Sequence, residues 1–223
     1  MDPYYQDEHV TLFHGDCLEF ADVWTGADVL VTDPPYGYDV KMCHGDGSAR
    51  GGSTAWHGAA IANDADLTAR DTALTLWGGR PALVFGSWKR PKPMQTRAVL
   101  IWDKGPAHGM GDLRIPWKPN HEEIYVLGEG FTGRRTSGVL SGYTQVTWAS
   151  KGLEHPNMKP LSLMIELIGK CPPGTIADPF AGSGSTLVAA RNLGRRAIGV
   201  ELEERYCEII AKRLAQGALD LGI

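Results

Sequence analysis

The chain has 223 residues, 43% of them hydrophobic, and a formal net charge of −4 at pH 7. Its length suits one α/β domain over residues 1–223, and no apolar run approaches the roughly 18 residues that a membrane span requires. The net charge excludes a generally basic protein that collects nucleic acid without selection, so any such contact must be local.

Seven short apolar runs bounded by glycine, proline or aspartate predict buried β-strands. In chain order they are Val10–Phe13, Val29–Val31, Ala82–Phe85, Ala98–Trp102, Ile124–Leu127, Ile176–Ala177 and Ala197–Val200. Helical patterns lie between some of them, at Asp66–Leu76, after Pro160 (Leu161, Met164, Ile165, Ile168), at Leu187–Leu193, and near the C-terminus (Tyr206, Ile209, Ile210, Leu214). Continuous apolarity predicts a sheet covered on both faces, and the alternation with helices predicts a doubly wound α/β fold.

Two stretches interrupt this pattern. Residues 38–63 contain Gly45-Asp46-Gly47-Ser48 and Gly51-Gly52-Ser53, which favours a long mobile loop. Residues 130–152 carry several glycines and are typical of an inserted surface segment. Loops of this length are usually functional or disordered.

The N-terminus and the cysteines indicate the compartment. Residues Met1–Tyr5 lack the basic start and apolar core of a signal peptide, and the four cysteines form no C-x-x-C pair. Both features predict a protein of the reducing cytoplasm. Cys43, His44 and His57 match no standard ligand spacing, so we expect no metal.

The most informative segment is an apolar strand that runs into Asp33-Pro34-Pro35-Tyr36. Ligands of open α/β sheets bind at the carboxyl ends of strands, where this tetrapeptide would lie. The prolines lack backbone donors and have a fixed φ, so their carbonyls and the Asp33 carboxylate form a rigid set of acceptors. Beside the ring of Tyr36, this set complements an amino group on an aromatic ring, which has two N–H donors and a π-face.

A second motif, Asp178-Pro179-Phe180-Ala181-Gly182-Ser183-Gly184-Ser185, lies between an apolar strand and a helix. Its two glycines permit close approach of a ligand to the backbone, and Ser185 can cap the helix. The next strand ends in Glu201, where an acidic side chain can bind ribose hydroxyls. The turn lacks the full G-x-G-x-x-G spacing of a pyrophosphate site, so an adenosyl cofactor fits better than NAD.

The tetrapeptide and the later glycine-containing motif together resemble the amino-methyltransferases that act on DNA adenine N6 or cytosine N4, in the permuted order of the β class. Further matching segments are Phe13-His14-Gly15-Asp16, Asn120–Leu127 and His155–Pro160. The resemblance implies a mostly parallel seven-stranded sheet of the Rossmann-like methyltransferase type. It also implies S-adenosyl-L-methionine as cofactor and double-stranded DNA as partner.

The resemblance assigns roles to individual residues. Asp16 would bind the adenine of the cofactor, Glu201 its ribose, and the Phe180–Gly184 turn its methionine part, with Lys159 and Pro160 alongside. The implied catalytic set is Asp33, Pro34, Pro35 and Tyr36. The implied cofactor set is Asp16, Cys17, Asp33, Lys159, Pro160, Asp178, Pro179, Phe180, Ala181, Gly182, Ser183, Gly184, Ser185, Glu201 and Leu202.

An exocyclic amine is a poor nucleophile because its lone pair is delocalised into the ring. Acceptors at Asp33 and the Pro34 carbonyl would favour a pyramidal nitrogen and direct methyl transfer. The paired base must then be flipped out of the duplex, where it can stack on Tyr36. Within the resembled family an aspartate at the first motif position favours adenine N6. Cytosine N4 methylation and a catalytically silent nucleic-acid-binding relative stay open as alternatives.

Residues 130–152 occupy the place of the target-recognition region of the resembled family, and this region is short here. Arg134, Arg135, Tyr143 and Gln145 are candidate DNA contacts, because arginine and glutamine can read base edges. A short target-recognition region favours a short or relaxed recognition sequence in the DNA, or a contribution from a second copy of the chain in a homodimer.

Overall fold

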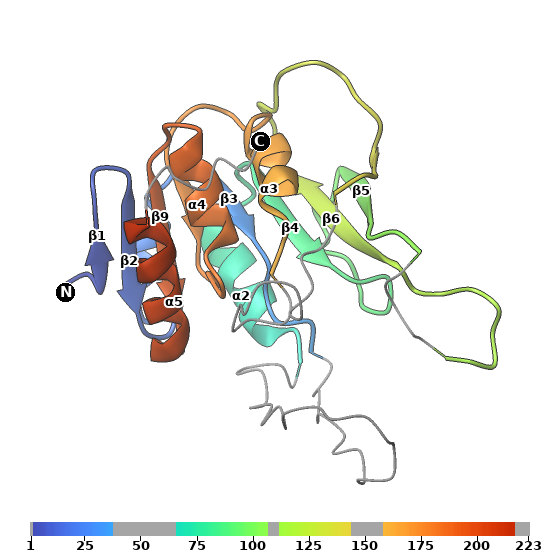
Figure 1. The fold of residues 1–223 in the computed structure, drawn as a ribbon, viewed down its shortest axis with the longest axis horizontal. Coiled ribbons are helices and arrows are strands. Elements are labelled where there is room, and N and C mark those ends of the chain that lie inside the picture. Colours follow the sequence, from blue (N-terminus) through green and yellow to red (C-terminus); the bar gives the residue numbers. More distant parts are fainter. Residues whose placement is uncertain (1, 38–65, 107–111, 144–157, 217–223) are drawn as a thin grey trace, which may run out of the picture.

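In the part of the chain that the structure describes, nine strands form one sheet in the order β1-β2-β9-β8-β3-β4-β6-β5-β7 (Figure 1). The computed structural model describes residues 2–37, 66–106, 112–143 and 158–216, so the predicted loop 38–63 lies outside the described residues. The strands are β1 (Tyr5–Gln6), β2 (Val10–His14), β3 (Val29–Thr32), β4 (Ala82–Gly86), β5 (Ala98–Asp103), β6 (His121–Leu127), β7 (Val139–Leu140), β8 (Ile176–Asp178) and β9 (Ala197–Glu201). The helices are α1 (Ala21–Trp24), α2 (Thr68–Trp77), α3 (Leu161–Ile168), α4 (Ser185–Asn192) and α5 (Glu204–Ala215).

The middle of the sheet is parallel. Strands β2, β9, β8, β3 and β4 run in one direction, whereas β1 and β6 are antiparallel to their neighbours. From β8 the chain passes through α4 to β9 on one side, and from β3 it passes through α2 to β4 on the other. The boundary between β8 and β3 is therefore a topological switch point, where open α/β sheets bind their ligands.

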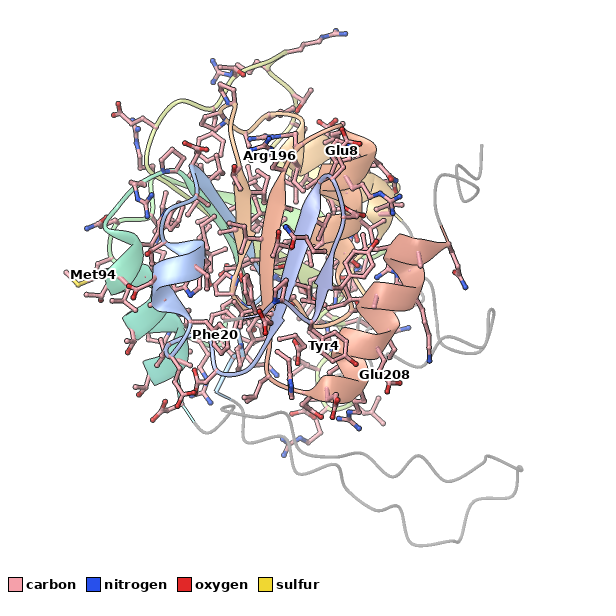
Figure 2. All side chains as sticks on the ribbon, turned by 90° about the vertical axis from the view of Figure 1, so that its left-hand side faces the viewer. Tyr4, Glu8, Phe20, Met94, Arg196 and Glu208 are labelled. Carbon is pink, nitrogen blue, oxygen red and sulfur yellow. The ribbon has the colours of Figure 1, made fainter. Side chains whose placement is uncertain are left out.

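Helices cover both faces of this sheet, with α5, which carries Glu208, on the opposite face from α1 and α2 (Figure 2). Val29 and Val31 of β3 pack into the core beneath α3, α4 and α5, and Leu30 between them packs beneath α1 and α2. Trp24 and Trp77 stack in the second core with ring centroids 6.2 Å apart. Burial on both faces explains why the strands are continuous apolar runs.

The predicted fold class and all seven predicted strands are confirmed, but the sheet has nine strands instead of seven. The additional strands, β1 and β7, have two residues each and lie at the two edges of the sheet. No helix in the described ranges is long and apolar enough to cross a membrane.

Candidate active site

The carboxyl ends of the parallel strands bring the two sequence motifs together. Strand β3 ends one residue before Asp33, and the neighbouring β8 ends at Asp178. Across this boundary the Thr32 hydroxyl donates a hydrogen bond to Asp178 Oδ1 at 2.7 Å, and both side chains are buried. The two motifs, distant in the chain, therefore lie on either side of the switch point.

The Asp33 carboxylate is held through both of its oxygens. The Tyr36 hydroxyl donates to Oδ1 at 2.7 Å, and the Lys159 ammonium donates to Oδ2. Pro34 is buried and Pro35 is half-buried, so the sheet supports the turn. The Asp33 side chain is 34% exposed, and it is accessible from the open edge of the sheet.

Beside Asp33 lies a buried cluster of opposite charges. The Lys159 ammonium is 3.2 Å from Glu122 Oε2, and the Lys104 ammonium contacts Glu122 Oε1. Burial opposes ionisation of Glu122, but Lys159 and Lys104 outweigh it and hold the pKa of this carboxyl below its usual value. Burial likewise disfavours charged Lys159, yet the carboxylates of Asp33 and Glu122 raise its pKa above the ordinary value. Glu122 and Lys159 therefore stabilise each other's ionised forms.

The glycine turn is fixed by its own backbone and by Glu201. The backbone N–H of Gly182 donates to Glu201 Oε2 at 2.7 Å, and that of Gly184 donates to the Ala181 carbonyl at 2.7 Å. Gly184, in the left-handed region at φ +77°, is the N-cap of α4. The expectation that Ser185 caps this helix was wrong, because its hydroxyl donates instead to the Lys159 carbonyl at 3.0 Å.

Two carboxyls beside the turn are buried and reluctant to ionise. Burial raises the pKa of Asp178 to about 6, although hydrogen bonds from Thr186, Thr32 and the Phe180 N–H act against it. Burial also raises the pKa of Glu201 to about 7 against two backbone hydrogen bonds, and the charge of Asp178 adds to the rise. Both carboxyls thus lie in a place where a positively charged or hydroxyl-rich ligand would favour their ionised forms.

Asp16 and Cys17 follow β2 at the same edge of the sheet. Asp16 is half-buried, and its Oδ1 accepts a hydrogen bond from the Leu18 N–H at 2.9 Å. Cys17 is buried, its carbonyl accepts a hydrogen bond from the Trp24 indole, and burial raises the pKa of its thiol to about 12. Cys17 therefore packs against the core as a neutral thiol.

The other residues of the implied cofactor set surround the glycine turn. Pro179, Ala181 and Ser183 are buried, Phe180 is half-buried, and Leu202 is 39% exposed just after β9. Pro160 is the N-cap of α3. No group of three or more potential metal ligands occurs in the described ranges, and Cys43, His44 and His57 lie outside them.

Of the candidate DNA contacts in the described residues, only Tyr143 lies at this edge. Arg134 and Arg135 belong to the connection between β6 and β7, which lies at the upper edge of the sheet in Figure 1, whereas β3 runs down to the lower edge. Backbone contact of Thr132 with Lys170, beyond the end of α3, holds this connection there. Tyr143 lies near the end of β5, where its carbonyl accepts the Trp102 indole N–H at 3.2 Å. Gln145 lies outside the described residues.

Three side chains that had no predicted role are parts of this site. Glu122 and Lys104 complete the charge cluster, and Arg90 donates to the Gly37 carbonyl just after the proline motif. A signal for Glu122 was present, because an acidic residue at the start of a mostly buried strand calls for a partner.

Comparison with known proteins supports one family. A family model for N6/N4-type DNA methylases matches residues 132–212. The chain is 29% identical over 220 residues to the putative methylase YubD of Escherichia coli (strain K12), covering 93% of this chain and 92% of YubD. It is 27% identical over 273 residues to the type II methyltransferase M.ScaI of Streptomyces caespitosus, covering 98% of this chain and 86% of M.ScaI. Among solved structures, the M1.HpyAVI–SAM complex superposes with a TM-score of 0.64 at 19% identity, covering 92% of this chain and 99% of that chain.

The fold is thus the Rossmann-like fold of the S-adenosylmethionine-dependent methyltransferases, as the sequence predicts. These similarities support a DNA amino-methyltransferase, of the kind that acts on adenine N6 or cytosine N4. The matching family model describes DNA methylases, and the superposed M1.HpyAVI structure is a complex with S-adenosylmethionine.

Proposed function

We propose that this protein methylates adenine N6 in double-stranded DNA with S-adenosyl-L-methionine as the methyl donor. The observation that carries the proposal is the hydrogen bond between Thr32 and Asp178, which joins the proline motif to the glycine turn. Because Asp33 directly follows Thr32, an acceptor for an amino group lies next to the turn that suits the methyl donor.

The residues around the glycine turn fit the cofactor. An added Cβ at Gly182 would meet only the Phe180 carbonyl oxygen, 3.9 Å away, so a ligand can approach the backbone there. Glu201 and Asp178 suit a ligand with hydroxyl donors or positive charge. Hydrogen bonds within the protein do not fully offset the cost of burying their charged forms, so such a ligand would stabilise the carboxylates. Asp16 would hold the amino group of the cofactor's adenine. When bound, the cofactor supplies an electrophilic methyl group on a sulfonium.

The proline motif prepares the amino group of the base for attack. The Asp33 carboxylate and the Pro34 carbonyl would each accept one N–H of the amine. With both N–H bonds held, the nitrogen lone pair is directed out of the ring and toward the methyl group. Acceptors fixed in advance also stabilise the positive charge that develops on nitrogen, an effect of about 3–4 kcal/mol per group in comparable sites.

The target amine is paired inside the duplex, so the base would have to leave the stack before it reaches Asp33. The half-buried Tyr36 would then stack on it, a contact typically worth about 1–3 kcal/mol. Adenine is favoured over cytosine because the first motif residue is aspartate, which in this family leans toward adenine N6.

The duplex would approach the carboxyl edge of the sheet, where the site opens. Two loops there present an exposed tryptophan next to a lysine: Trp88-Lys89 follows β4, and Trp117-Lys118 precedes β6. Trp88 is 55% exposed and Trp117 is 77% exposed. Aromatic rings that stack on bases, combined with cations that neutralise phosphates, are typical of nucleic-acid contact. These loops therefore support a DNA-binding face around the active site.

The test is to incubate the purified protein with unmethylated DNA and methyl-labelled cofactor, digest the DNA, and identify the labelled nucleoside. Label in N6-methyldeoxyadenosine supports the proposal, and label in N4-methyldeoxycytidine reassigns the enzyme to cytosine. Cofactor binding without label in either base would indicate a silent relative.

The matched variant for this assay is Asp33→Ala. We expect its transfer rate to fall at least about 100-fold, since one electrostatic contact in an active site is commonly worth that much. Its affinity for the cofactor, measured by calorimetry, should change little because Glu201 and the glycine turn are intact. Turnover retained in this variant would remove Asp33 from the mechanism.

A further inference from the structure

Lys159 contacts both halves of the proposed active site. Its backbone carbonyl accepts a hydrogen bond from the hydroxyl of Ser185, the first residue of α4 after the glycine turn, at 3.0 Å. Its ammonium donates to Asp33 Oδ2. One residue therefore fixes the acceptor of the amino group relative to the cofactor turn.

The Lys159 side chain is only 9% exposed, and its ammonium lies 4.9 Å from the centroid of the Phe85 ring. A cation in such a place needs a carboxylate partner, because an uncompensated buried charge is strongly destabilising. Asp33 alone could meet this need, but its charge would then be committed to the lysine. A second carboxylate close to Lys159 relieves Asp33 of that demand.

Glu122 is this second carboxylate. The pairing of Gly86 with Glu123 places the start of β6 beside the end of β4, close to the proline motif. Glu122 Oε2 is 3.2 Å from the Lys159 ammonium, and Lys104 holds the other oxygen. Glu122 therefore stays ionised and pairs with Lys159 in addition to Asp33.

The Tyr36 hydroxyl lies between the same two carboxylates. It donates to Asp33 Oδ1 at 2.7 Å and is 3.5 Å from Glu122 Oε2. The Lys159 ammonium already donates to Asp33 Oδ2, so we assign Oδ1 as the acceptor of an incoming amino group. A small shift of the hydroxyl toward Glu122 preserves its hydrogen bond and leaves Oδ1 to the base.

We propose that Lys159 and Glu122 form a positioning pair for methyl transfer, an inference that rests on the proposed function. Lys159 aligns Asp33 with the cofactor turn. Glu122 holds Lys159 and receives the Tyr36 hydroxyl when an amino group binds Asp33. Both residues act through Asp33 and Tyr36, not on the transferred methyl group.

The test measures the single-turnover rate of methyl transfer with saturating DNA and cofactor, together with the Kd for S-adenosyl-L-homocysteine. We expect Lys159→Met to slow transfer about 100-fold, the usual cost of a misplacement near 1 Å. Glu122→Gln, which keeps the shape but removes the charge, should slow it about tenfold. The Kd should stay within threefold of the wild-type value in both variants, a result that a general loss of structure would not produce.

Two further variants sharpen the test. Lys159→Arg should recover at least tenfold of the rate lost in Lys159→Met, because its guanidinium keeps the charge and can bridge two carboxylates. Lys212→Met is the matched control, since Lys212 pairs with Glu208 on α5 and is bonded to neither Asp33 nor Glu122, and its rate should stay within threefold. If Lys159→Met does not fold, the transfer rates of Glu122→Gln and Lys159→Arg test the proposal.

The positioning pair is contradicted if folded Lys159→Met and Glu122→Gln both transfer methyl within threefold of the wild-type rate. It is also contradicted if Lys212→Met is slowed as much as Glu122→Gln, because loss of any one charge would then explain the effect. Assay of the wild-type protein distinguishes failure of the proposed function from failure of the positioning pair. If it labels no base, the proposed function fails; if it labels DNA and the variants are as fast, only the positioning pair fails.

Discussion

Glu201 is a carboxyl whose surroundings make its charge depend on pH near neutrality. Burial raises its pKa to about 7, and the backbone N–H groups of Glu203 and Gly182 only partly oppose this rise. In the protein without cofactor, both the neutral and the ionised forms are therefore present at neutral pH. A ribose hydroxyl donates its hydrogen bond best to the ionised form.

We therefore expect cofactor affinity to fall as the pH is lowered from 8 to 6. A ligand that needs the carboxylate must displace a proton below pH 7, which costs up to about tenfold in Kd per pH unit. Calorimetry at pH 6, 7 and 8 measures the affinity and the proton released. Glu201→Gln should bind more weakly at pH 8 and lose most of this dependence, and a wild-type affinity that is constant from pH 8 to 6 would rule out Glu201 as a ribose ligand.

The residues of this site differ in how readily the sequence identifies them. Asp33, Tyr36 and the glycine turn belong to short segments whose chemistry is local, so their order in the chain was enough to single them out. Glu122 acquires its place from the pairing of β6 with β4, a register that no local pattern encodes. The direction of the Lys159 ammonium, toward Asp33, likewise depends on how α3 packs on the sheet.

At the scale of elements, the turn between β8 and α4 depends on the backbone of Gly184. This residue has φ +77°, and an added Cβ would lie 2.8 Å from Ile210 Cγ1 on α5. Gly194, shortly after α4, also has a left-handed φ of +66°, but an added Cβ there would meet nothing within 4 Å. The two glycines share a conformation and differ in their surroundings, so they form a matched pair.

We expect Gly184→Ala to lower the free energy of unfolding by about 2–5 kcal/mol, since left-handed strain costs about 1–2 and overpacking about 1–3 kcal/mol. Gly194→Ala should lose only the strain, about 1–2 kcal/mol. Urea unfolding of the two variants measures the difference. Equal losses would mean that α5 yields to the new methyl group, contrary to the close packing seen between Gly184 and Ile210.

The predictions of helices and strands succeeded where the apolar run or the helical spacing of apolar residues was long enough to be recognised. The four predicted helices and seven strands were identified by apolar runs or helical spacing. Strands β1 and β7, with two residues each, and the single-turn helix α1, with four, are too short for any period to be recognised. Their formation depends on neighbours already in place, as when β1 adds to the edge of β2.

At the scale of the whole molecule, two opposite edges of the sheet compete as the DNA-binding face. The carboxyl edge carries the catalytic motif and the exposed Trp117, and the other edge carries the exposed pair Arg134 and Arg135. A base flipped from a bound duplex must reach Asp33. This requirement favours the carboxyl edge as the main surface.

We expect Trp117→Ala to weaken DNA binding by about 1–3 kcal/mol, the usual worth of one aromatic stacking contact. The double variant Arg134→Ala/Arg135→Ala should weaken it less. Fluorescence anisotropy of a labelled duplex, at one fixed salt concentration because phosphate contacts depend on salt, compares the two. A larger loss in the double arginine variant would instead support the contacts predicted from the sequence, with DNA extending to the other edge.

The hydrogen bond between Thr32 and Asp178 joins residues that are 146 positions apart, and β2 near the N-terminus pairs with β9 near the C-terminus. Acceptor and donor chemistry are therefore encoded in separate stretches of the chain, and each stretch needs the other to complete its part of the sheet. A nascent or cleaved polypeptide that contains only one of these stretches lacks either the proposed acceptor or the glycine turn. The proposed acceptor and the glycine turn are thus brought together only when both ends of the chain are in place in the sheet.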